Sequence, residues 1–102
     1  SLAEPIAAAA TRMLTAKTYY ELYENETLLN YIDSSRHFLQ NNSSINESRK
    51  KQYGGLLNNL SQLVNLRLRR DPESINNFRN SVLNSEQNEN VSWILKKADE
   101  LI

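Results

Sequence analysis

The sequence predicts an all-α fold of about five helices, and three observations lead to it. The 102 residues include only two glycines and two prolines, whereas an all-β domain needs frequent turn residues. Apolar residues recur every three or four positions, which is the spacing of one face of a helix. Asparagine and serine gather between these periodic stretches, where their side chains compete for backbone hydrogen bonds and so favour helix ends.

The first expected helix spans about residues 2–23. Pro5 falls in its first turn, where the missing N–H costs little. The break follows at Glu24-Asn25, where we expect an asparagine in the left-handed C-terminal conformation. The expected buried face carries apolar and aromatic residues at helical spacing: Ile6, Ala9, Met13, Ala16, Tyr20 and Tyr23.

The second expected helix spans about residues 26–40 and ends in the polar run 41–44. Tyr31 and Phe38 lie two turns apart and form a stripe beside the buried one. The buried stripe itself consists mainly of aliphatic residues: Leu28, Leu29, Ile32, Ser35 and Leu39.

The third expected helix is the longest and spans about residues 47–69. Asn46 or Ser44 is placed to cap it, and Ile45 to pack on its first turns. Gly54-Gly55 lies inside the helix and costs it about 2 kcal/mol relative to alanine. Such a pair indicates either a kink or a closely crossing helix, and we expect the crossing. The buried residues are expected to be Tyr53, Leu56, Leu57, Leu60, Leu63, Val64 and Leu66.

The last two helices are shorter. Asp71-Pro72-Glu73 combines an N-cap, a first-turn proline and a first-turn acid, so it predicts a helix that runs to about Leu83. The fifth helix is expected over about residues 89–101, with Trp93 beside its buried stripe. The inward residues of the two helices are Ile75, Phe78, Val82 and Leu83, then Val91, Ile94, Leu95, Ala98 and Leu101.

The composition excludes several kinds of function. Twelve basic residues balance twelve acidic ones, and there is no cysteine, so thiolate metal sites and disulfides are impossible. We expect a cytoplasmic protein without a membrane span, because no apolar run approaches about 18 residues. The single histidine, His37, excludes paired-histidine metal motifs. It lies within one helical turn of Asp33 and Ser34, not in a convergent pocket, so we expect no enzyme and no cofactor.

The charges are unevenly placed along the chain. Residues 47–70 carry six basic groups and one acidic group. A basic helix can contact phosphates, so a small nucleic-acid-binding domain that uses the helix around residues 49–70 is the alternative function. The balanced net charge makes nucleic acid the less favoured partner, because proteins that bind it usually carry an excess of positive charge.

Ala16 and Tyr19 on the first expected helix, with Leu28, Ile32 and Ser35 on the second, form a helical hairpin with small residues at its crossing. This pattern resembles the tetratricopeptide repeat, in which such positions recur on the two helices. The match covers roughly residues 9–42, and it departs from the family at Arg12 and Thr15, where an aromatic residue and a leucine are usual. The resemblance implies an irregular, repeat-like or solenoid-like array of helices that binds protein through a concave face.

A second resemblance runs from Tyr19-Tyr20-Glu21-Leu22 through Arg36-His37-Phe38-Leu39 to Tyr53 and Leu63-Val64. This stretch is similar to the C-terminal helical region of large uncharacterised bacterial proteins of the Bacteroidetes type. The resemblance implies no activity. We expect residues 1–102 to form one all-helical domain of a longer protein, since the first residue is not methionine.

The expected function is therefore non-enzymatic protein–protein interaction or scaffolding. The partner is either another protein or the remainder of the parent chain, and self-association into a homo-oligomer is a further expectation. Aromatic and arginine side chains commonly carry the energy of such contacts. The side chains expected to serve here are Tyr19, Tyr23, Tyr31, Phe38, Trp93, Arg67, Arg69 and Arg70.

Overall fold

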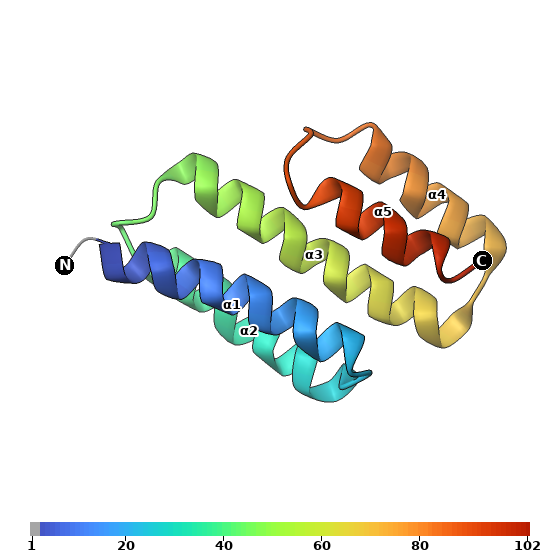
Figure 1. The fold of residues 1–102 in the computed structure, drawn as a ribbon, viewed down its shortest axis with the longest axis horizontal. Coiled ribbons are helices and arrows are strands. Elements are labelled where there is room, and N and C mark those ends of the chain that lie inside the picture. The colour runs from blue at the N-terminus through green and yellow to red at the C-terminus, as the bar shows by residue number, and fades with distance from the viewer. Residues whose placement is uncertain (1–2) are drawn as a thin grey trace. The chain divides into compact units, whose positions relative to one another are not determined.

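The computed structural model of the chain describes residues 3–102, in which every regular element is a helix (Figure 1). This confirms the predicted all-α class and the five helices. The chain divides into two compact units, Ser1–Ser61 and Gln62–Ile102, and the third helix contributes to both. The helices are α1 (Ala3–Glu21), α2 (Asn25–Asn41), α3 (Glu47–Arg69), α4 (Pro72–Leu83) and α5 (Val91–Asp99).

In the first unit, α1 packs against α2 as a helical hairpin (Figure 1). Ala16 and Ser35 are both completely buried in it, and side chains this small let two helices approach closely. The rest of the buried face follows the predicted stripes: Ala9, Met13 and Tyr20 on α1, and Leu28, Ile32 and Leu39 on α2.

Three residues predicted to be buried in the hairpin are exposed. Ile6 and Leu29 are each 37% exposed, because they stand at the edges of their stripes, and Tyr23 is 67% exposed, because it lies beyond the end of α1. Tyr23 also holds the left-handed conformation predicted for an asparagine, with φ of 59°. Its N–H donates to the carbonyl of Tyr20, and the N–H of Glu24 donates to that of Tyr19. This hydrogen-bond pair is a Schellman motif, which ends the helix at that position.

The first part of α3 completes this unit. Its N-terminus is capped by Asn46, whose Oδ1 accepts a hydrogen bond of 2.8 Å from the backbone N–H of Arg49. Ile45 is 1% exposed, as expected for a residue that packs onto the first turns of a helix. The closely crossing helix predicted at Gly54-Gly55 is wrong, because a methyl group added to either glycine would meet nothing within 4 Å.

In the second unit, α4 packs against α5 (Figure 1). Asp71 caps α4 as predicted, since its Oδ2 accepts from the backbone N–H of Ser74 at 3.0 Å and from its hydroxyl at 2.6 Å. An ion pair of 2.8 Å joins Arg79 Nε of α4 to Asp99 Oδ1 of α5. The apolar core of the unit consists of Leu63, Val64, Ile75, Phe78, Val82, Val91, Ile94, Ala98 and Leu101.

Leu83 was predicted to be buried in this unit but is exposed. It is 44% exposed, because it is the last residue of α4 and extends past the stripe. Leu66 and Leu95, also predicted inward, are half-buried. Among the helices of residues 3–102, none is long and apolar enough to cross a membrane.

Candidate functional site

The candidate site is a line of side chains along one flank of the α1–α2 hairpin, which we call the Arg12 seam. Four of them, from both helices, are half-buried, and Ser34 is exposed. They meet because residues spaced by three, four or seven positions share a helix face, so that α1 supplies one row and α2 the other. The seam consists of Arg12, Tyr19, Tyr31, Ser34 and Phe38.

The guanidinium group of Arg12 occupies the middle of the seam. Its Cζ lies 5.1 Å from the ring centroid of Tyr31 and 5.0 Å from that of Phe38, within the range of cation–π attraction. Its Nη1 donates to the hydroxyls of Ser34 and Ser35, at 3.2 Å each. These contacts hold the guanidinium group in place against the surface of α2.

Tyr19 extends the seam toward the turn of the hairpin. Its ring meets the ring of Tyr31 edge to face, with the centroids 5.4 Å apart and an angle of 79° between the planes. This is a preferred geometry for aromatic pairs. The predicted contact residues Tyr19, Tyr31 and Phe38 are therefore brought together in one place.

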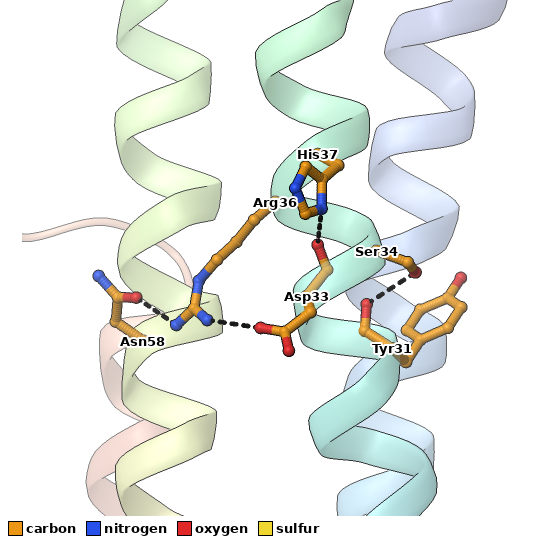
Figure 2. Close-up of polar contacts among 6 residues, drawn as sticks. All are labelled: Tyr31, Asp33, Ser34, Arg36, His37 and Asn58. Atoms are coloured by element: carbon orange, nitrogen blue, oxygen red, sulfur yellow. Dashed lines mark hydrogen bonds and ion pairs between the residues drawn. The ribbon is translucent and has the colours of Figure 1, made fainter.

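Polar side chains of α2 also make hydrogen bonds away from Arg12 (Figure 2). Arg36 binds Asp33 through Nη1 at 3.2 Å and Asn58 of α3 through Nη2 at 2.7 Å. His37 Nδ1 donates to the backbone carbonyl of Asp33 at 2.9 Å, and the hydroxyl of Ser34 donates to the carbonyl of Tyr31 at 3.1 Å. The serine, histidine and aspartate thus bond to different groups and do not form a relay.

The other predicted contact residues lie apart from the seam. Tyr23 is exposed in the turn after α1. Trp93 is half-buried on α5, where Nζ of Lys97 lies 5.5 Å from its ring centroid. Lys97 is itself 6% exposed and pairs with Glu100 at 3.1 Å. Trp93 thus contacts a lysine that is itself mostly buried, on the second unit of the chain.

The arginines that end α3 differ from one another. Arg67 is only 8% exposed, so most of its side chain lies inside the protein. Arg69 and Arg70 are exposed, and Arg70 has a φ of 52° just past the end of the helix. At the other end of α3, Arg49 Nη1 donates to the hydroxyl of Tyr53 at 3.1 Å. Arg67, Arg69 and Arg70 thus do not present one uniform basic surface.

The second unit also holds a groove that the sequence pattern did not indicate. It has a volume of about 430 Å³ and is open to the surface. Its lining is mostly amides and hydroxyls over an aromatic ring: Gln62, Asn65, Leu66, Ser74, Asn77, Phe78 and Ser81. The groove carries no charged group, so its lining offers only neutral hydrogen-bond partners.

Sequence reasoning missed Arg12 itself as a site residue. The signal was present, because Arg12 and Tyr19 are seven positions apart on α1, just as Tyr31 and Phe38 are on α2. Finding the site required knowing which flank of α1 meets which flank of α2. Among residues 3–102, no three His, Cys, Asp or Glu side chains lie close enough together to hold a metal ion.

Comparison of the chain with protein-family models, with curated proteins and with solved structures gives no match. The resemblances to the tetratricopeptide repeat and to the Bacteroidetes-type helical region therefore stay predictions from the residues named above.

Proposed function

We propose that this chain is a non-enzymatic protein-interaction or scaffold domain, and that the Arg12 seam contacts its partner. The observation that carries the proposal is the gathering of three aromatic rings and an arginine on one flank of the hairpin. Aromatic and arginine side chains dominate the energy of protein interfaces, since they combine large contact areas with directional polar groups.

The position of the seam on α2 supports this use. Arg36 reaches Asn58, so its side of α2 faces α3. Tyr31 precedes Arg36 by five residues, which corresponds to a rotation of about 140° around the helix. Tyr31 therefore lies on a different side of α2 from the side that bonds to α3, and a partner can approach the seam from there.

A photo-crosslinking experiment tests the proposal. A photoreactive amino acid is placed at Ser34 in the seam, or at Gln40 as a control, which is exposed on another face of α2. In cells of the source organism, we expect one defined adduct from position 34 that weakens in Phe38→Ala and is absent from position 40. Equal adducts from both positions, or none from position 34, would refute the seam as the interface.

The alternative function is nucleic-acid binding by residues 49–70 of α3. Several of these cations make contacts within the protein, since Arg49 bonds to Tyr53, Lys50 pairs with Glu47 at 3.9 Å, and Arg67 is buried. Titration of labelled DNA and RNA at rising salt separates the two functions. Binding that weakens steeply with salt would favour the alternative, because phosphate contacts release counterions.

A further inference from the structure

We infer that the partner segment carries a carboxylate, an aspartate or glutamate side chain, which binds the free edge of the Arg12 guanidinium group between the aromatic rings of the seam. This inference rests on the proposed function and specifies the chemistry of the partner. Three observations support it: the hydrogen bonds that Arg12 makes, the N–H donors that these bonds do not use, and the charges around the guanidinium group.

The hydrogen bonds of Arg12 within the protein use only one of its nitrogens. A guanidinium group has five N–H donors, and the two on Nη1 point to the hydroxyls of Ser34 and Ser35. The donors on Nε and Nη2 are left on the adjoining edge of the same plane. Two parallel N–H groups on one edge match the two oxygens of a carboxylate.

The charge of Arg12 also lacks a counterion on the seam. Within residues 3–102, the contacts of Arg12 are to hydroxyls and aromatic rings, and none is to a carboxylate. The α1 positions 8, 12, 15 and 19 and the α2 positions 27, 31, 34 and 38 share the two faces that meet here. Arg12 is the only charged residue among these eight, so a negatively charged group of the partner would complement the charge of the seam.

The charge and the shape of the surface favour a carboxylate over a phosphate. A phosphate monoester carries a charge of about −1.5 to −2 and usually binds clusters of cations, whereas the seam offers a single guanidinium. The walls around it are the rings of Tyr31 and Phe38, which can pack against apolar side chains that flank an acidic residue. A peptide with an acidic residue between apolar ones therefore fits best.

Selection from a library of random peptides displayed on phage tests the inference, with the full chain as bait. We expect enriched peptides to share an Asp or Glu flanked by apolar residues. Arg12→Gln should weaken their binding by about tenfold to a hundredfold, as expected for the loss of charge-assisted hydrogen bonds. Arg12→Lys keeps the charge without the paired donors and should fall between. Lys96→Gln, which removes an exposed cation on α5, is the matched control and should change nothing.

Three results would overturn the inference. Peptides that need Tyr31 and Phe38 but carry no acidic residue would leave the proposed function intact and refute the carboxylate. Peptides that inorganic phosphate displaces at constant ionic strength would assign Arg12 to phosphate. If no enriched peptide responds to changes at Arg12, Tyr31 or Phe38, both proposals fail. Thermal melts of each variant show that a loss of binding is not a loss of fold.

Discussion

The guanidinium carbon of Arg12 on α1 lies 5.0 Å from the ring centroid of Phe38 on α2. The same guanidinium group donates to Ser35, whose side chain is completely buried between the two helices. Arg12 thus contacts both a buried residue of the hairpin and a half-buried aromatic residue on its flank. A residue in this position affects both the stability of the hairpin and what the hairpin can bind, and the two effects can be measured separately.

The stability effect is tested by replacing Arg12. We expect Arg12→Ala to lower the free energy of unfolding by about 1–2 kcal/mol, because it removes a hydrogen bond to a buried hydroxyl and two cation–π contacts. Urea denaturation followed by circular dichroism measures the change. The double variant Arg12→Ala/Ser35→Ala should lose less free energy of unfolding than the two single variants lose in total, since each substitution removes the same hydrogen bond. Strict additivity would show that the hydrogen bond does not contribute.

The second prediction concerns the two glycines inside α3. A methyl group at either position meets nothing within 4 Å, so alanine there should favour the helix without a clash. We expect Gly54→Ala and Gly55→Ala each to raise the free energy of unfolding by about 0.4–1 kcal/mol, and the pair to add. The melting temperature measures the gain. A fall in either variant would mean that another part of the chain does approach these glycines.

The helix ends that the sequence predicted well are those with a local chemical signal. The ends of α3 and the start of α4 match the predicted residues, because Asn46 and Asp71 provide capping oxygens and Pro72 favours a first turn. The end of α1 has no such signal, since a tyrosine holds the left-handed position. The start of α5 was predicted two residues early. Asn88 there accepts hydrogen bonds from Asn90 and Val91 and forms a turn before the helix.

The candidate site was predictable only in part, for a physical reason. The sequence indicated Tyr31 and Phe38 as one stripe, because both lie on a single helix. Arg12 and Tyr19 lie on a different helix, and their meeting with that stripe depends on how α1 and α2 are rotated about their axes. Periodicity within one helix does not report this rotation. For the same reason, the prediction of a helix that crosses closely at Gly54-Gly55 is wrong.

The third prediction concerns the outer face of α1. Near the N-terminus the sequence carries the apolar residues Leu2, Ala3, Ile6 and Ala10; Leu2 and the Ala3 side chain lie outside the described residues. Ile6 and Ala10 are exposed, and Leu14, four residues further on the same face, is 66% exposed. We expect the chain to self-associate through this face, because burying it removes apolar area from water.

Light scattering over a series of concentrations measures this association. Leu14→Gln should lower the average mass at the highest concentrations. Leu68→Gln is the matched control, since Leu68 is 68% exposed on α3 and the substitution is the same. A constant monomer mass for the unaltered chain at every concentration would contradict self-association.

The fourth prediction concerns the pH dependence that Asp71 gives to the stability of the fold. Hydrogen bonds from the hydroxyl and then the backbone N–H of Ser74 hold the pKa of the Asp71 carboxyl below its ordinary value of 3.8. The folded state therefore favours the ionised form, and the resulting stabilisation is complete above the unfolded pKa. It is lost as the pH falls below 3.8 and through the folded pKa.

Asp71→Asn isolates this contribution, because asparagine also caps helices but does not titrate. At neutral pH the unaltered chain should be the more stable of the two, since an ionised group near a helix N-terminus is favourable. The difference should shrink as the pH falls below 3.8. Urea denaturation at a series of pH values measures it, and Glu89→Gln, at an exposed position before α5, corrects for the change in net charge. If the difference between the unaltered chain and Asp71→Asn stays constant down to the lowest pH, the Ser74 hydrogen bonds do not favour the ionised carboxylate.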